Sequence, residues 1–229
     1  SAKITYTLYG NWVDGTYAGF DRDYAQMNMA ATFMYPVGYD MVPRTLQLDY
    51  TDRTNWSAVT QLKPLGNNKY WAKDFQYFMD SPVQAGELKT SSFEVSSADG
   101  SKQNVHLVTN AIDAQPVVDN FTKMIKRMVE EQKEVFGEYP TFDYGHFYFM
   151  QNVNKQNAGD GMEHRNSTVI VETDDKIEGN EADMLSTFSH EFFHAWNVER
   201  LRPSTLEPFK FEHSNVTDGL WFAEGFTQY

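Results

Sequence analysis

Residues 181–196 read EADMLSTFSHEFFHAW, and this stretch decides the fold of the second half of the chain. Asn180 before it is a candidate N-cap, and the acidic residues of the first turn suit the positive end of a helix dipole. Apolar side chains then recur at helical spacing until Pro203, which cannot continue a helix. We therefore expect a helix that begins at Asn180 and runs through His194 and Trp196 until Pro203.

Two histidines lie one turn apart on this expected helix. His190 and His194 therefore face the same side, where both imidazoles can bind a single Zn²⁺ ion. Glu191 is rotated away from that line and can reach a water molecule on the metal. This is the H-E-x-x-H pattern of zinc hydrolases, in which the glutamate is the general base. The alternative is an ordinary helix that carries two histidines on a partly buried face.

A third protein ligand is expected because two histidines leave a tetrahedral zinc site incomplete. Residues 218–229 predict a further helix, in which Glu224 is flanked by the apolar residues Trp221, Phe222, Ala223 and Phe226. A carboxylate in so apolar a stretch is costly to bury unless a cation pairs with it. We expect Glu224 to complete the metal site, and the alternative is a carboxylate on an exposed stripe of the helix. Zinc would lower the pKa of its water to about 7, and Glu191 would take the proton as that water attacks a carbonyl carbon.

The first half of the chain has the texture of short strands separated by turns. Alternating or β-rich stretches occur at residues 4–9, 27–35, 44–50 and 104–108, with Gly, Asn, Asp and Pro between them. Such spacing is typical of a β-sandwich. We expect residues 1–112 to form a β-sandwich-like N-terminal domain that is incomplete at its start.

Residues 113–229 have a mixed character. Apolar residues at three-to-four spacing predict an amphipathic helix over residues 116–136, ended by Gly137. Residues 145–150 and 167–171 have the pattern of strands. The expected fold class is therefore α+β, with a domain boundary near residue 112.

The composition excludes several classes of protein. A formal net charge of −13, from 32 acidic and 19 basic residues, opposes binding to nucleic acid or to an anionic membrane surface. No apolar run approaches the roughly 18 residues that a spanning helix needs, so we expect no transmembrane segment. The chain has no cysteine, so any metal site must be built from histidine and carboxylate side chains.

Several motifs resemble those of the glycyl aminopeptidase family of zinc metallopeptidases, a family of gluzincin type. The strongest are GMEHRNST at residues 161–168, HEFFHAWNV at 190–198 and WFAEGFTQY at 221–229. Further matches are MDSPV at residues 79–83, Phe136-Gly137 with Pro140, and Arg202-Pro203. The resemblance runs across nearly the whole chain, and three ordered motifs are far more specific than one.

The resemblance implies a β-rich N-terminal domain, then a thermolysin-like catalytic domain and, in full-length members, a PDZ-like domain. It also implies His190, His194 and Glu224 as zinc ligands and Glu191 as the catalytic base. The chain stops at Tyr229. We therefore expect it to hold the first part of the catalytic domain of a longer protein.

Residues Gly161, Met162 and Glu163 are similar to the exopeptidase strand of the related alanyl aminopeptidases, which binds the substrate. The glutamate there holds the free α-amino group, a role that falls on Glu163 in this sequence. A carboxylate that binds one ammonium group counts off one residue from the N-terminus. The alanyl enzymes carry Asn after the glutamate, whereas His164 and Arg165 follow here, so a zinc endopeptidase stays open. A plain surface ion pair between Glu163 and Arg165 is the other alternative.

These features predict a zinc aminopeptidase that acts on peptides with a free N-terminus. The resemblance alone implies a preference for small N-terminal residues such as Gly or Ala. The alternatives are a zinc endopeptidase and a peptide-binding module with an incomplete, inactive metal site. A bacterial periplasmic or exported location is expected rather than a cytoplasmic one.

Overall fold

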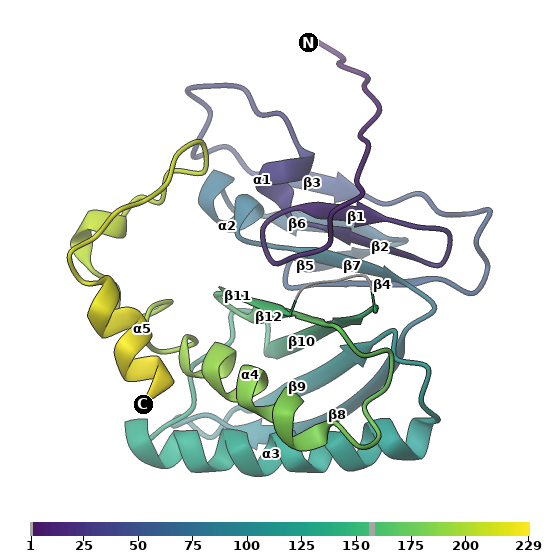
Figure 1. The fold of residues 1–229 in the computed structure, drawn as a ribbon. Helices are drawn as coiled ribbons and strands as arrows, with labels where there is room; N and C mark the ends of the chain where they lie inside the picture. Colours follow the sequence, from purple (N-terminus) through teal and green to yellow (C-terminus); the bar gives the residue numbers. More distant parts are fainter. Residues whose placement is uncertain (1, 156–158) are drawn as a thin grey trace.

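Two antiparallel sheets form the N-terminal part of the computed structural model, which describes residues 2–155 and 159–229. The first sheet has the order β1-β2-β7-β4, with β1 (Ala18–Phe20), β2 (Tyr24–Met27), β4 (Ser57–Thr60) and β7 (Val83–Gly86). The second has the order β3-β6-β5, with β3 (Arg44–Gln47), β5 (Lys63–Gly66) and β6 (Lys69–Ala72). Two short helices, α1 (Met29–Thr32) and α2 (Phe75–Met79), lie beside these sheets (Figure 1).

One apolar core joins the two sheets. It contains Met27 and Val83 from the first sheet and Leu46 and Ala72 from the second, and all four side chains are buried. This shared core confirms a β-rich N-terminal part with two layers. We call residues 2–87 the N-terminal module.

Two of the expected strands are wrong. Residues 4–9 form no strand, and Ile4 and Tyr9 are exposed, because this segment has no neighbouring strand to pair with in the part of the chain that the structure describes. In the expected strand 27–35, β2 ends at Met27 and α1 follows. Asn28 caps this helix, since its side chain accepts a hydrogen bond from the N–H of Ala30 at 3.1 Å.

A five-stranded sheet organises residues 88–229, which we call the C-terminal module. Its order is β11-β12-β10-β9-β8, with β8 (Lys89–Ser96), β9 (Lys102–Thr109), β10 (His146–Val153), β11 (Asp160–His164) and β12 (Ser167–Glu172). The three central strands are parallel, and the two edge strands β8 and β11 are antiparallel to their neighbours. Strand β9 precedes residue 112, where the texture of the sequence changes, and β10 follows it. The two strands pair, so one sheet contains strands from both sides of this residue.

Helices α3 (Gln115–Phe136) and α4 (Glu181–Phe193) cover one face of this sheet, and the N-terminal module lies over the other (Figure 1). The bounds of α3 confirm the predicted helix over residues 116–136. Pro116 lies in its first turn, and Gly137 ends it in the left-handed conformation with φ of 83°. The observed fold is therefore mixed α+β, as the sequence predicts.

Aromatic side chains hold α4 against the other layers. The ring of Phe188 packs edge-on against Phe121 of α3 at 5.2 Å and contacts Phe149 of β10 at 5.1 Å. Phe192, one turn later, packs edge-on against Phe147 at 5.0 Å. This buried aromatic face fixes the rotation of α4 about its own axis.

The helix α4 ends at Phe193, well before Pro203, so the expected length was wrong. The chain continues in tightened turns, in which the N–H groups of Ala195 and Trp196 bond to carbonyls three residues back. The carbonyl of Ala195 accepts a hydrogen bond from the side chain of Arg200 at 2.7 Å. A side chain therefore takes the place of a helical N–H at this carbonyl.

The segment after α4 leaves the sheet and returns as α5 (Leu220–Gln228), with a short 3-10 helix η1 (Ser204–Leu206) on the way. Its outer part lies against α2 of the N-terminal module (Figure 1). The ring of Phe211 packs edge-on against Phe75 at 5.7 Å, and Nε2 of Gln76 donates a hydrogen bond to the carbonyl of Phe209 at 2.9 Å. Among the described residues, no helix combines the length and the hydrophobicity that a membrane span requires.

Two histidines lie on the sheet face that the N-terminal module covers. Nε2 of His106 on β9 is 2.9 Å from Nδ1 of His146 on β10, and the ring of His106 stacks on Tyr148. Burial, and then the neighbouring His146, lower the pKa of His106 to about 4. Burial also lowers the pKa of His146, so both rings are neutral near pH 7.

This pair predicts a pH dependence of stability. The folded pKa of His106 lies below its usual 6.5, so between about pH 6.5 and 4 the unfolded chain binds the proton more readily. The free energy of unfolding should therefore fall as the pH drops through this window, by on the order of 2 kcal/mol from this group. In the variant His106→Gln the free energy of unfolding should fall less steeply with decreasing pH than in the wild type. Urea unfolding at a series of pH values measures this slope. The exposed His213→Gln is the control, and equal slopes for all three proteins would contradict the prediction.

Candidate active site

The two histidines of α4 lie on the side of the helix that faces away from its buried aromatic residues. Nε2 of His190 is 3.2 Å from Nε2 of His194, and the two rings are nearly perpendicular. His194 is buried, and His190 is about a quarter exposed with 24% of its side chain accessible. Phe188 and Phe192 fix this orientation from the opposite side of the helix.

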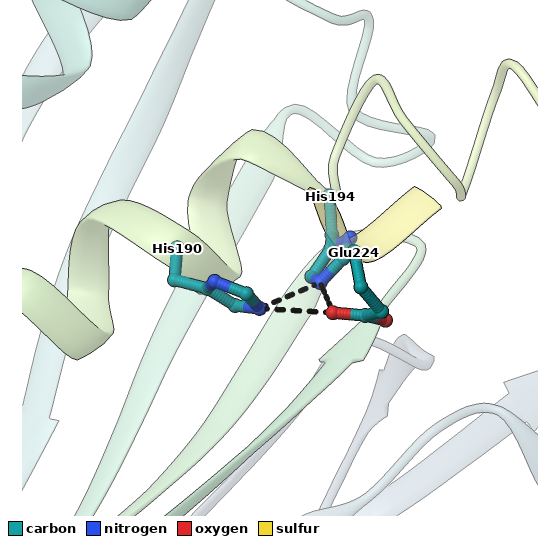
Figure 2. Close-up of side chains that lie close together, drawn as sticks. All are labelled: His190, His194 and Glu224. Carbon is teal, nitrogen blue, oxygen red and sulfur yellow. Dashed lines mark hydrogen bonds and ion pairs between the residues drawn. The ribbon is translucent and has the colours of Figure 1, made fainter. Parts of the chain in front are cut away.

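Glu224 of α5 completes a cluster with these histidines. Its Oε2 lies 3.2 Å from Nε2 of His190 and 3.6 Å from Nε2 of His194, and all three side chains point toward one another (Figure 2). Ligands at 2.0–2.1 Å from a tetrahedral zinc ion lie about 3.3–3.4 Å from each other. The spacing of the three atoms therefore fits a zinc ion, and the donor set of two imidazoles and one carboxylate suits this metal.

The surroundings of Glu224 differ from those that the sequence predicts. The carboxylate is half exposed, and Trp221 and Phe226 on the same helix are exposed as well. Ala223 and Thr227 form the buried side of α5. The argument that an apolar environment forces Glu224 to find a cation was therefore wrong, although the residue lies beside both histidines.

Each histidine has a hydrogen-bond partner on its other ring nitrogen. Nδ1 of His194 is 2.8 Å from the carbonyl oxygen of Asn197, and Nδ1 of His190 is 3.0 Å from Oε1 of Gln228. Oxygen atoms of this kind accept, so each Nδ1 carries the proton and each Nε2 presents its lone pair to the cluster. Sequence reasoning missed Gln228, although its position one turn after Glu224 places it on the same side of α5.

Glu191 lies next to His194 and Glu163 with its carboxylate buried. Burial, followed by the charges of Glu163, Glu224 and Asp160, raises the pKa of Glu191 to about 9. Its Oε2 has no hydrogen-bond partner in the described part of the chain. A cation at the cluster would lower this pKa again, because nearby positive charge favours the carboxylate.

The carboxylate of Glu191 lies against the backbone of Gly161 on strand β11. A Cβ atom at position 161 would come within 2.1 Å of Oε1 of Glu191. Glycine is therefore required here by close approach, and not by its backbone angles. Any side chain at this position would displace the carboxylate.

Glu163 lies two residues further along β11 and points to the same side. Its carboxylate, the carboxylate of Glu191 and a ring nitrogen of His194 lie within 4.8 Å of one another. Arg165 pairs with Asp143 at 2.8 Å, and residues 2–155 and 159–229 contain no ion pair between Arg165 and Glu163. The alternative of a plain surface pair with Arg165 was therefore wrong.

Met162 lies on the other side of the strand. Its Cβ approaches Gly15 of the N-terminal module, so its side chain is directed away from the histidines. Its carbonyl oxygen accepts a hydrogen bond from Oγ1 of Thr168 at 3.0 Å. Of the three residues expected to bind substrate, Gly161 and Glu163 therefore face the cluster, and the side chain of Met162 does not.

The contact between His190 and Gln228 predicts an effect on metal affinity. In the variant Gln228→Leu, His190 loses the partner that orients its ring, so zinc affinity should fall roughly tenfold. Competition with a chromophoric chelator measures the affinity. Phe226→Leu, an exposed change on the same helix, is the control and should bind zinc like the wild type. Equal affinity of Gln228→Leu and wild type would show that this contact does not orient the ring.

Solved structures of other proteins are similar in fold to this chain, among them two aminopeptidases. An aminopeptidase N family protein from Idiomarina loihiensis matches with a TM-score of 0.77 and 24% sequence identity over 96% of this chain and 38% of that chain. Aminopeptidase A from Legionella pneumophila, solved in complex with aspartic acid, matches with a TM-score of 0.54 and 13% identity over 80% of this chain and 24% of that chain. This chain therefore spans well under half the length of either protein.

Family models match a segment at each end of the chain. A comparison with curated proteins found no match. The model of the peptidase M61 N-terminal domain matches residues 1–87. The model of the M61 glycyl aminopeptidase matches residues 183–229, which include the histidine pair and Glu224. The two matches lie in the expected order and together cover more than half of the sequence. The chain belongs to the M61 glycyl aminopeptidase family.

Proposed function

We propose that this chain carries the metal-binding and amine-binding residues of a zinc aminopeptidase that releases small N-terminal residues, Gly or Ala, from peptides. The observation that carries the proposal is the position of Glu163 beside Glu191 and His194. The size preference rests on the family alone. Because the chain spans 38% of the Idiomarina protein, the activity is proposed for the full-length protein.

The residues proposed to hold zinc are His190, His194 and Glu224. Their spacing fits the ion, and the partners on both Nδ1 atoms direct the lone pairs of the imidazoles toward it. Zinc bound there supplies a Lewis acid that polarises a carbonyl group and acidifies water.

Glu191 is the proposed general base. Its unpartnered Oε2 is an acceptor for the proton of a water molecule that attacks the peptide carbonyl carbon. The same oxygen then gives the proton to the nitrogen of the leaving amine. The close backbone of Gly161 keeps this carboxylate in one place while it exchanges the proton.

Glu163 is proposed to bind the free α-ammonium group of the substrate. Standard backbone dimensions place the nitrogen of an amino acid only about 2.5 Å from its own carbonyl carbon. A carboxylate within 4.8 Å of His194 can therefore hold the ammonium of the residue whose carbonyl is attacked. One more residue would move the ammonium about 3.3–3.6 Å further away, out of reach.

Two other functions are separated from this one by simple tests. A zinc endopeptidase would use the same metal residues without holding an α-amine on Glu163. A peptide-binding module with an inactive metal site would bind peptides without turnover. A bacterial periplasmic or exported location belongs to our proposal, and fractionation of the producing cells tests it.

The proposed base and amine site predict two outcomes for the full-length protein. Glu191→Gln should keep its zinc but lower kcat by about 10²–10⁴-fold, because only the proton acceptor is lost. Wild type should cleave glycyl and alanyl anilides and fail on their N-acetylated forms, which have no ammonium. Metal analysis and anilide hydrolysis measure both. Cleavage that acetylation leaves unchanged would exclude the aminopeptidase and favour the endopeptidase.

The contact at Gly161 predicts a further loss of activity. Gly161→Ala places a methyl group where the Glu191 carboxylate now lies, so kcat should fall by about 10²-fold. Zinc content should not change, because no metal residue moves. Gly225→Ala on α5, where the new methyl group meets nothing within 4 Å, is the control. Wild-type kcat in Gly161→Ala would show that the carboxylate has room elsewhere.

A further inference from the structure

Strand β11, which carries Glu163, lies at the edge of its sheet. It pairs with β12 on one side, and within the described residues no strand pairs with its other side. An edge strand with one neighbour is held less firmly than a central strand, because half of its backbone groups have no partner strand. The position of Glu163 therefore depends on what holds β11 besides β12.

The C-terminal end of β11 is held by Asp80 of the N-terminal module. Nδ1 of His164 is 2.9 Å from Oδ1 of Asp80, and the N–H of Arg165 donates to Oδ2 of the same carboxylate at 3.1 Å. His164 is buried, with 6% of its surface exposed. A buried imidazole hydrogen-bonded to a carboxylate has a single favourable orientation.

The N-terminal end of β11 is held by the same module. Oδ2 of Asp160, the first residue of the strand, accepts a hydrogen bond from the N–H of Gly15 at 2.8 Å. Glu163 therefore lies between two points at which the N-terminal module grips the strand. Along β11, Glu163 faces the metal cluster and His164 faces the opposite way, toward Asp80.

The turn that follows β11 is fixed from two directions. Gln61 of the N-terminal module accepts hydrogen bonds from the N–H of Asn166 at 2.7 Å and from Oγ of Ser167 at 3.0 Å. Nη1 of Arg200 donates to the carbonyl of Arg165 at 2.9 Å, and the same atom donates to the carbonyl of Ala195 just beyond His194. One guanidinium group thus ties this turn to the segment that follows the metal-binding helix.

We propose that the Asp80–His164 pair is a positioning device for Glu163, so that the N-terminal module helps to form the site that binds the substrate's α-amine. This inference rests on the proposed aminopeptidase function. Asp80 itself does not touch the substrate. It acts through His164, its neighbour Arg165 and the strand.

The test is peptide binding without turnover, in the full-length, zinc-loaded protein with the Glu191→Gln substitution. Calorimetry gives the Kd of Gly-Ala-Ala and of its N-acetylated form, and the ratio of the two is the preference for a free amine. Glu163→Gln should abolish this preference. Asp80→Asn should reduce it about fivefold, and adding Asp80→Asn to Glu163→Gln should change nothing more, because residues that act through one group are not additive.

Asp74→Asn is the matched control. Asp80 is the C-cap of helix α2, and Asp74 is the N-cap of the same helix. The side chain of Asp74 accepts a hydrogen bond from the N–H of Tyr77 at 2.8 Å. Asp74→Asn removes one negative charge from the same helix and keeps an acceptor at the N-cap, so the preference for a free amine should not change. If Asp80→Asn does not fold, His164→Gln takes its place, since it removes the imidazole from the same pair.

The outcomes separate the two claims. Equal binding of free and acetylated peptide by the parent Glu191→Gln protein would overturn amine recognition, and with it the proposed function. The other case is a parent protein that prefers the free amine. If Asp80→Asn and His164→Gln then keep the same preference, the positioning role alone is overturned. Additive losses in Asp80→Asn and Glu163→Gln would also overturn it, because they would mean that Asp80 acts independently of Glu163.

Discussion

The rotation of α4 about its axis is the constraint on which the candidate site depends. Phe188 and Phe192 insert into the aromatic layer between α3 and the sheet, and only one rotation of the helix allows this. Helical geometry then places His190 and His194 on the opposite side, with their ring nitrogens 3.2 Å apart. The hydrophobic core therefore sets the geometry of the polar cluster, and no separate interaction is needed to bring the two histidines together.

The sequence predicted what depends on local periodicity. The helix α3 follows its apolar repeat from Pro116 to the glycine stop, and His190 and His194 lie one turn apart because a single helix carries both. The failures have a common cause. Residues 4–9 alternate like a strand but pair with no strand in the described chain. The helix α4 gives way after Phe193 to tightened turns, where the side chain of Arg200 donates to the carbonyl of Ala195. Both outcomes depend on contacts between segments, which periodicity does not contain.

The candidate site shows the same division. Sequence motifs identified Gly161, Glu163 and Glu224. The structure places Glu163 and Glu224 beside the histidines and Gly161 against Glu191. The spacing of residues in the sequence could not identify the side chains that hold these residues in place. Asp80 reaches His164 across 84 positions, and the nearby Gln61 reaches Asn166 across 105. Such partners are visible only in the folded chain, because no local pattern links residues that lie so far apart in the sequence.

The contact of Phe211 with Phe75 makes the position of Glu224 depend on both modules. The segment between His194 and Glu224 does not cross directly from one helix to the next, but rests on α2 of the N-terminal module along its way (Figure 1). The two histidines come from a helix of the C-terminal module, whereas the segment that leads to Glu224 has part of its support in the N-terminal module. The carboxylate of Glu224 therefore reaches the two histidines along a path that the folded N-terminal module supports.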